Sequence, residues 1–378
     1  MADSLAVHPT RRDWLKAGAA TLAALALSPR LAFPAVPSSS SPAPAGPVRL
    51  TLNENPFGPS PRVVEALAKN LSGLSRYVED EASALVRQIA TYEQVPPGHI
   101  VLGEVLEPLG FHLGLQGGPG GEFLYSAPGY NALVDAALPV GGVSVGVPLD
   151  ADLRNDLPAL RARLNERTRA VFLVNPHNPS GTVHDPQPFK DFVRAVSRRA
   201  LVIVDEAYLE YTDDFAARTA AALVREGENV AVFRTFSKAY GLAALPFGYT
   251  VAPLGLAADL TKAGVGSPHS LNRLALVAAS AALADQDFVA GVRARVTAEH
   301  AAWNDLFREL GVRHAEARGN FVFFETRVPH ATFAAALLSR GVDIGRAFPP
   351  LDTWARITIG LPEENTRARE AVRAVFAA

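Results

Sequence analysis

The segment Asn229-Val230-Ala231-Val232-Phe233-Arg234-Thr235-Phe236-Ser237-Lys238-Ala239-Tyr240-Gly241-Leu242 begins as an apolar run and becomes polar around Lys238. A short continuous apolar run rich in β-branched residues predicts a strand that is buried on both faces of a sheet. Lysines in such positions are usually solvated surface residues. Here Thr235 and Ser237 bring hydroxyl groups beside the amine, so the segment is a candidate site.

Similar apolar runs recur along the chain and alternate with amphipathic stretches. Helices are predicted at Asp156–Leu164, Pro188–Arg198 and Phe215–Glu226, between the apolar runs 100–102, 122–125, 143–145, 170–174, 201–204 and 229–233. This alternation predicts an α/β fold with a mostly parallel sheet covered on both faces. From residue 286 a long helical stretch leads into strands at 321–324 and 356–359. We therefore expect a large domain over 48–285, including an N-terminal arm, and a smaller α+β C-terminal domain over 286–378.

Two other predicted strands also end in polar residues. The run 170–174 continues into a rigid turn that contains Asn178, and the run 201–204 continues into Asp205 and Tyr208. Ligands of such sheets bind beyond the carboxyl ends of the strands. Each segment alone is a weak signal. Together with Lys238 they predict one binding site at this edge of the sheet.

The first residues differ in composition from the rest of the chain. Arg11 and Arg12 precede an apolar stretch that is too short to span a bilayer, and a Ser/Pro/Ala-rich linker follows. Residues 1–35 resemble a twin-arginine (Tat) signal segment, and residues 36–47 the linker. This resemblance implies export through the Tat translocon to a periplasm, without a membrane anchor.

Composition excludes several other functions. The chain has 378 residues, no cysteine and a formal net charge of -2. The absence of cysteine removes disulfides, thiolate nucleophiles and cysteine-ligated metals, and we expect no metal site. No basic stripe is present that would neutralise a run of phosphates, so nucleic acid is not an expected partner.

The motifs resemble, in their order, those of the fold-type I pyridoxal-phosphate (PLP) aminotransferases. The resemblance runs from the segment 52–59, Leu-Asn-Glu-Asn-Pro-Phe-Gly-Pro, to the segment 356–360, Arg-Ile-Thr-Ile-Gly. It is strongest to the histidinol-phosphate aminotransferase-like branch. The resemblance implies the PLP-transferase fold type I, a PLP cofactor, and an amino acid and a 2-oxo acid as small-molecule substrates.

The resemblance also implies roles around the cofactor ring. Lys238 would form a Schiff base with PLP and move the proton during the reaction. Asp205 would keep the pyridine nitrogen protonated, which makes the ring an electron sink. Asn178 and Tyr208 would hydrogen-bond to the ring's phenolic oxygen, and Tyr130 would stack on the ring.

Four more residues match positions that bind substrate or the partner subunit. Arg356 matches the planar two-pronged donor for a substrate carboxylate. Asn320 matches an asparagine near the same carboxylate, and Arg346 lies near the arginine that binds a distal substrate group. Tyr77 resembles the tyrosine that reaches the phosphate in the neighbouring subunit, which implies a homodimer.

The expected phosphate site departs from the family pattern. Thr235 and Ser237 match its hydroxyls, but Pro246 stands where the family has an arginine, and the segment 103–108 lacks the usual serine at the helix start. Backbone amides there could still bind a phosphate. Loss of one charge-assisted contact costs about 1.5–3 kcal/mol. We therefore expect weaker PLP binding, unless Arg234 or a partner-subunit residue substitutes.

The leading hypothesis is an aminotransferase that moves an amino group between an amino acid or related amine and a 2-oxo acid. A racemase, lyase or decarboxylase uses the same lysine and protonated ring, so the sequence leaves these reactions open. Pro246 and Leu106 also motivate a third hypothesis, a non-catalytic protein that binds PLP or an amino acid.

Overall fold

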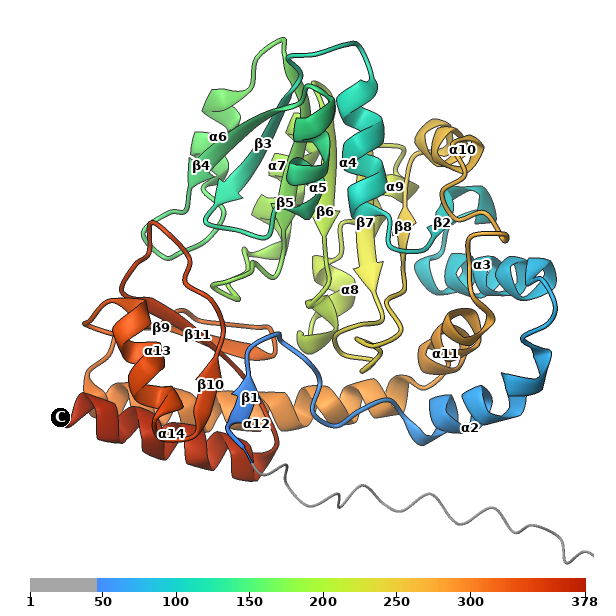
Figure 1. Ribbon diagram of the computed structural model, residues 1–378. Helices are drawn as coiled ribbons and strands as arrows, with labels where there is room; N and C mark the ends of the chain where they lie inside the picture. Colours follow the sequence, from blue (N-terminus) through green and yellow to red (C-terminus); the bar gives the residue numbers. More distant parts are fainter. Residues whose placement is uncertain (1–45) are drawn as a thin grey trace, which may run out of the picture. The chain divides into compact units, whose positions relative to one another are not determined.

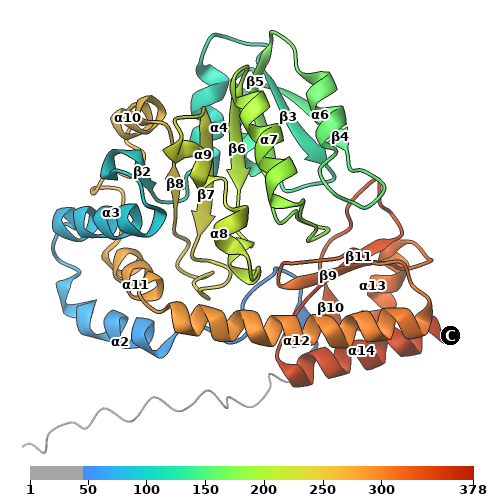
Figure 2. The same ribbon diagram turned by 180° about the vertical axis from the view of Figure 1, so that it is seen from behind.

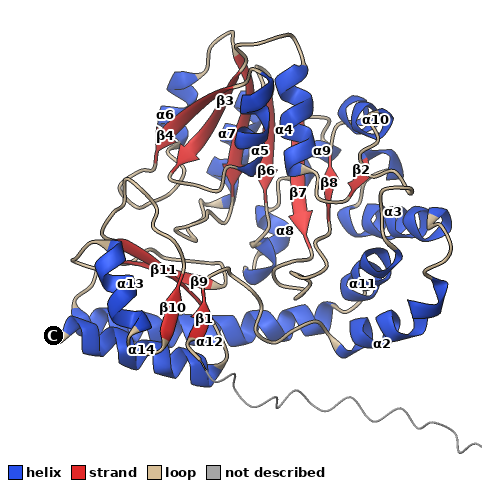
Figure 3. Cartoon of the chain, in the orientation of Figure 1, coloured by secondary structure: helices blue, strands red, loops and turns tan. Residues whose placement is uncertain are grey.

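A seven-stranded sheet forms the centre of the computed structural model, which describes residues 46–378 (Figures 1 and 3). The predicted signal segment and most of the predicted linker lie outside the described residues. In spatial order the strands are β2 (Ile100–Leu102), β8 (Gly248–Val251), β7 (Val230–Thr235), β6 (Leu201–Asp205), β5 (Thr168–Val174), β3 (Glu122–Ala127) and β4 (Val143–Pro148).

The sheet is mostly parallel, which confirms the α/β prediction. Strand β8 alone runs antiparallel to both of its neighbours, β2 and β7. Strands β5, β6 and β7 are adjacent and parallel, and their register pairs Val174 with Asp205 and Asp205 with Phe233. The carboxyl ends of these three strands therefore lie side by side, as the candidate site requires.

Helices cover both faces of this sheet. Helices α4 (Leu106–Leu115) and α5 (Ala132–Ala137) lie on the face nearer the viewer in Figure 1. Helices α7 (Pro186–Ser197) and α9 (Ala221–Arg225) cover the opposite face, seen in Figure 2. Successive strand residues point to opposite faces. Phe172 therefore packs in the α4/α5 core, and Leu173 packs in the core on the α7 side.

The remaining strands lie beside helices from the C-terminal third of the chain. Strand β1 (Val48–Leu50) pairs in parallel with β10 (Val342–Ile344), and β9 (Phe321–Glu325) pairs antiparallel with β11 (Trp354–Thr358). Helices α12 (Gln286–Leu310), α13 (His330–Leu338) and α14 (Pro362–Phe376) pack next to them. The N-terminal arm is thus joined to the C-terminal part of the chain. The predicted domain boundary at 285/286 stays a prediction.

The segment 215–226 was expected to be one helix, and this expectation is wrong. Helices α8 (Phe215–Arg218) and α9 are separate, with Thr219 in an extended conformation between them. The buried Glu206 carboxylate accepts a hydrogen bond from the Ala220 backbone N–H at 2.6 Å, and the Thr219 hydroxyl accepts one from Ala221. These side-chain acceptors replace helical carbonyls, so the helix stops and restarts.

Four helices lie near the β2 edge of the sheet: α2 (Pro61–Asn70), α3 (Glu79–Glu93), α10 (Leu254–Lys262) and α11 (Arg273–Leu283). Helix α6 (Leu157–Arg163) lies near β3 and α7. Within residues 46–378, no single helix has both the length and the apolar character of a membrane span. Only α11 and α12 meet that standard together, as a pair bent by 76°.

Candidate active site

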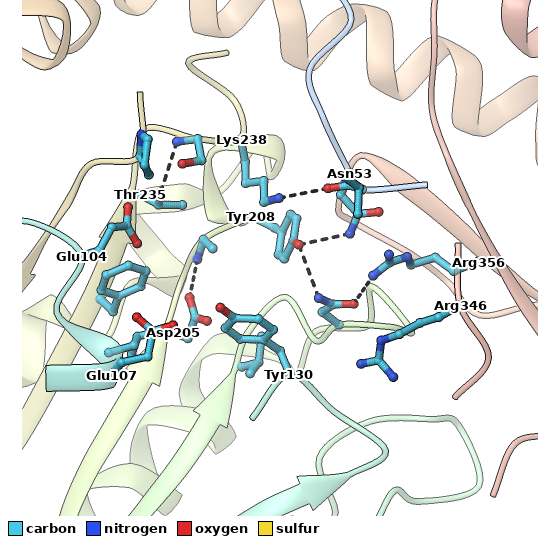
Figure 4. Close-up of a pocket in the computed structure, with 18 residues that line it drawn as sticks. Asn53, Glu104, Glu107, Tyr130, Asp205, Tyr208, Thr235, Lys238, Arg346 and Arg356 are labelled. Atoms are coloured by element: carbon cyan, nitrogen blue, oxygen red, sulfur yellow. Dashed lines mark hydrogen bonds between the residues drawn. The ribbon is translucent and has the colours of Figure 1, made fainter. Parts of the chain in front are cut away.

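A cavity of about 550 Å³ lies at the carboxyl ends of β5, β6 and β7. It brings together most of the residues that the sequence singled out, from segments far apart in the chain (Figure 4). Its lining consists of Leu52, Asn53, Glu104, Leu106, Glu107, Tyr130, Val174, Asn178, Asp205, Ala207, Tyr208, Phe233, Thr235, Ser237, Lys238, Pro246, Arg346 and Arg356.

Lys238 projects into the cavity from the tight loop that follows β7. Its Nζ donates a hydrogen bond to the Leu52 carbonyl at 3.1 Å and lies 5.8 Å from the centre of the Tyr208 ring. Gly241 turns this loop with a φ of +74°, and a Cβ there would collide with the Gly58 carbonyl. Only glycine combines this backbone conformation with so close an approach, so Gly241 lets the lysine loop lie against the N-terminal arm.

Asp205 is the last residue of β6, and its side chain faces the cavity while only 2% of the residue is exposed. Its carboxylate accepts one hydrogen bond, from the Ala207 backbone N–H at 3.0 Å. Burial raises the pKa of Asp205 to about 7, and the nearby Glu104 carboxylate adds to this shift. A cation placed beside Asp205 would therefore be strongly favoured.

Tyr208 and Asn178 meet at the centre of the cavity. The Tyr208 hydroxyl accepts hydrogen bonds from the side-chain amides of Asn53 at 3.1 Å and Asn178 at 3.4 Å. Phe321 packs edge-on against the Tyr208 ring, with 5.2 Å between the ring centres. Sequence reasoning did not single out Asn53, although the residue lies in the 52–59 motif that carried the resemblance.

Arg356 in β11 forms the wall opposite the sheet. Its Nη1 donates to the Asn178 side-chain oxygen at 2.6 Å, and its Nη2 donates to the Thr51 carbonyl at 2.9 Å. The guanidinium lies against the rings of Phe321 and Phe348. Its Nε is buried and has no hydrogen-bond partner within the described chain. The group is therefore fixed in orientation, and each Nη retains one further N–H that is not used in these two hydrogen bonds.

Arg346 and Tyr130 also line the cavity. Arg346 is exposed, and its guanidinium lies 4.6 Å from the centre of the Phe348 ring. Tyr130 lies beside Asp205 in Figure 4. Burial and the neighbouring Asp205 carboxylate raise the pKa of Tyr130, so this phenol stays neutral.

Two predicted site residues do not line the cavity. Asn320 is fully buried, and its side-chain amide donates to the carbonyls of Asn53 at 3.0 Å and Glu54 at 3.1 Å. Its geometry therefore supports a role in holding the N-terminal arm rather than direct contact with substrate. Tyr77 is 77% exposed and packs edge-on against His269, with ring centres 5.1 Å apart, so it serves no ligand of its own chain's cavity.

Comparison with known proteins gives the family. Residues 45–372 match the family described as aminotransferase class I and II. The chain belongs to this family. It is 40% identical over 329 residues to a histidinol-phosphate aminotransferase of Limosilactobacillus fermentum, covering 86% of this chain and 89% of that protein. It is 35% identical over 327 residues to an aromatic amino acid aminotransferase of Streptomyces avermitilis, covering 85% and 89%.

A solved structure extends this comparison to the cofactor. The histidinol-phosphate aminotransferase of Sinorhizobium meliloti in complex with pyridoxal-5'-phosphate matches with a TM-score of 0.77 and 28% identity, over 88% of this chain and 91% of that one. The fold is the PLP-transferase fold type I. The protein is a PLP-dependent aminotransferase, which confirms the predicted fold, enzyme class and cofactor.

The ring end of the cavity fits PLP. Asp205 supplies the buried carboxylate that a protonated pyridine nitrogen would pair with. Lys238 supplies an amine for the aldehyde. Tyr208 and Asn178 supply polar groups for the ring oxygen, and Tyr130 supplies an aromatic face.

The phosphate end fits less well. Thr235 and Ser237 are present there, and no side chain caps the start of α4, which leaves its first amides for an anion. Pro246 adds no charge, however, and two carboxylates line the cavity, Glu104 beside Thr235 and Glu107 near Asp205 (Figure 4). Sequence reasoning considered the segment 103–108 only for its missing serine and did not assign these two glutamates to the site.

Arg234 does not replace the missing arginine, so that suggested substitution is wrong within a single chain. Its guanidinium is only 1% exposed and pairs with Glu206 at 2.9 Å, Glu93 at 3.4 Å and Glu210 at 3.5 Å. It is absent from the cavity lining. Arg234 instead joins the start of the lysine loop to the segment after Asp205 behind the site.

We predict that Arg234→Met destabilises the protein by about 3–5 kcal/mol, because it leaves buried carboxylates without their cation. Burial already raises the pKa of Glu210 to about 7 from a normal value of 4.5. A raised carboxyl pKa means that stability falls as pH rises through this range. The loss should therefore be larger at pH 8 than at pH 5, as measured by urea unfolding.

Arg198→Met is the matched control, since Arg198 is exposed at the C-terminal end of α7. It should change the free energy of unfolding by less than about 0.5 kcal/mol. An Arg234→Met protein with native stability and weakened PLP binding would contradict the structural role and point to a phosphate contact.

Proposed function

We propose that this aminotransferase takes an α-amino acid as donor and a 2-oxo acid as acceptor, with Arg356 as the receptor for their carboxylates. The observation that carries the proposal is the guanidinium of Arg356, which lines the cavity while Asn178 and Thr51 hold it in place. A fixed planar donor suits a carboxylate better than a flexible ammonium does.

The residues around Arg356 have separate roles in this reaction. PLP, when bound, supplies an electron sink for the charge that develops on the substrate carbon. Lys238 hydrogen-bonds to the Leu52 carbonyl. Its amine moves the proton to and from the substrate carbon. Asn178 contacts both Tyr208 and Arg356, and so connects the residues for the ring oxygen with the carboxylate receptor.

Arg346 supports a further proposal, that the preferred substrate carries a second anionic group. Its exposed guanidinium lines the cavity, and its one side-chain hydrogen bond, at 3.3 Å, goes to the adjacent Ala347 carbonyl. The relatives' names offer two donor classes, an amine with a phosphate group and aromatic amino acids. Acidic amino acids complete the set of donors to be compared.

The test follows the PLP-bound protein by visible absorption while each donor is added. We expect conversion of the cofactor to its amine form together with one equivalent of 2-oxo acid, and Arg356→Lys should raise KM about tenfold or more because the two-pronged contact is lost. Arg163→Lys, at an exposed position outside the cavity, is the control. Racemisation or CO2 release with an unchanged PLP spectrum would contradict transamination.

We also propose a homodimer in which Tyr77 serves the partner subunit's cofactor phosphate. Homodimers are typical of this family, and Tyr77 is exposed and does not line its own cavity. Leu71 and Leu74, two further apolar residues of this segment, are each 55% exposed. Light scattering should give twice the mass of the chain, and Tyr77→Phe should weaken PLP binding without changing that mass. A monomer with full PLP affinity would overturn this proposal.

Finally, we propose export to a periplasm by the Tat translocon, on the basis of Arg11, Arg12 and the apolar stretch behind them. This pathway carries folded proteins, which suits an enzyme that acquires its cofactor before it crosses the membrane. Replacing both arginines by lysine should retain the protein in the cytoplasm, as measured by cell fractionation. Unchanged export of the double variant would reject the twin-arginine hypothesis.

A further inference from the structure

Carboxylates line the cavity near the position where the negatively charged phosphate of PLP would bind. In Figure 4 the Glu104 carboxylate lies beside Thr235, and the Glu107 carboxylate lies near Asp205. Glu107 lies in the first turn of α4 and Glu104 lies two residues before this helix, whose first backbone amides have no side-chain cap. A dianionic phosphate would therefore enter between hydroxyl and amide donors on one side and carboxylates on the other.

No cation at this end balances that charge within the described chain. Three cationic side chains line the cavity. Lys238 would be engaged by the cofactor's aldehyde. Arg346 and Arg356 come from the C-terminal part of the chain and lie at the opposite end of the cavity in Figure 4. Like charges brought together in a partly buried site repel one another, which favours the uptake of a proton by one of the groups.

We propose that Glu104 determines the affinity for the cofactor's phosphate, and that the phosphate binds together with one proton carried by the Glu104 carboxyl. The proton comes from solvent, and no covalent bond forms or breaks. As a neutral acid, Glu104 changes from a repelling anion to an O–H donor toward a phosphate oxygen. The inference rests on the PLP assignment, and not on which amino acid is transaminated.

Glu104 is suited to hold this proton. Although the open cavity leaves it accessible to water, the surrounding protein raises its pKa, and the Glu107 carboxylate raises that pKa further. The Thr235 hydroxyl and the Lys238 charge act in the opposite direction. A bound phosphate adds a second negative neighbour and must raise the pKa again.

The other groups that face this end do not supply a competing cation. Asp205 at the end of β6 is acidic, and Tyr130 after β3 is a neutral phenol. The loop after α10 approaches Gly103 through the uncharged Leu271. His269, in the same loop, packs on Tyr77.

The consequence is a pH dependence specific to the phosphate. Proton uptake makes PLP binding tighter as pH falls and weaker as pH rises. Pyridoxal, which lacks the phosphate, shares the aldehyde chemistry at Lys238 and the ring contact with Asp205. The ratio of the PLP and pyridoxal dissociation constants therefore isolates the phosphate end from the rest of the site.

The experiment measures the dissociation constants of PLP and pyridoxal at about pH 6 and pH 8.5 by titrating the full chain and following visible absorption. Glu104→Gln keeps the shape of the side chain and removes the charge. We expect it to tighten PLP binding about ten- to a hundredfold at the higher pH, much less at the lower pH, and to leave pyridoxal binding unchanged. Glu166→Gln, which removes an exposed glutamate outside the cavity, should change neither ligand.

Calorimetry of the wild-type protein provides a second test that needs no variant. Titrations of PLP in two buffers with different ionisation enthalpies count the protons taken up, and the count for PLP should exceed that for pyridoxal at pH 8.5. Pro246→Arg should tighten PLP binding and reduce this excess, because an arginine beside Glu104 favours its ionised form.

Equal PLP affinities of wild type and Glu104→Gln at both pH values, or equal proton uptake for PLP and pyridoxal, would overturn the proposal. A Glu104→Gln effect of the same size on both ligands would also overturn it, since it would locate the effect at the ring or at Lys238. Failure of the protein to transaminate any donor leaves these binding results unaffected, so the two proposals fail separately.

Discussion

The carboxylate of Asp205 is buried at the end of a central strand with a single backbone donor, and this is the constraint around which the site is organised. An ionised carboxyl in such a place is costly unless a cation joins it, and burial accordingly raises its pKa to about 7. A protonated pyridine ring relieves this cost. The cavity is thus electrostatically incomplete without a cationic ligand, and the parallel register of β5, β6 and β7 sets the neighbours that this ligand meets.

The N-terminal arm closes the other side of the site. Strand β1 pairs with β10, and the residues that follow it carry Asn53 to the Tyr208 hydroxyl and the Leu52 carbonyl to Lys238. Asn320, the residue before β9, holds the same arm by two hydrogen bonds to its backbone. Contacts between residues far apart in sequence therefore connect Lys238, Tyr208 and Arg356 in one network, and a change in the arm would affect all three.

Sequence predicted the part of the site that depends on local pattern. Polar residues after buried parallel strands had to meet at one edge, and Asn178, Asp205, Tyr208 and Lys238 do so because the strand order makes β5, β6 and β7 neighbours. The expectation of a single helix over 215–226 was wrong because of a contact from outside the segment. The Glu206 carboxylate competes for a backbone N–H there, and no pattern within the segment encodes that contact.

The charge around the phosphate end of the cavity also could not be predicted from the sequence alone. The absence of the family arginine at Pro246 was visible in the sequence, but its physical meaning depends on which way Glu104 and Glu107 face. Likewise, Arg234 is adjacent to the site in sequence and yet belongs to a buried acidic cluster behind it. Side-chain direction at a strand end is decided by packing from both faces of the sheet, so these assignments needed the fold.

The central claim is that Lys238, opposite the buried Asp205, is the residue that holds PLP. Reduction of the PLP-saturated protein with borohydride, followed by proteolysis and mass spectrometry, tests it directly because reduction makes the lysine–cofactor bond permanent. The account predicts the added pyridoxyl phosphate mass on the peptide that contains Lys238. The same mass on the peptides of Lys69, Lys190 or Lys262, or its absence from every peptide at saturating PLP, would contradict the account.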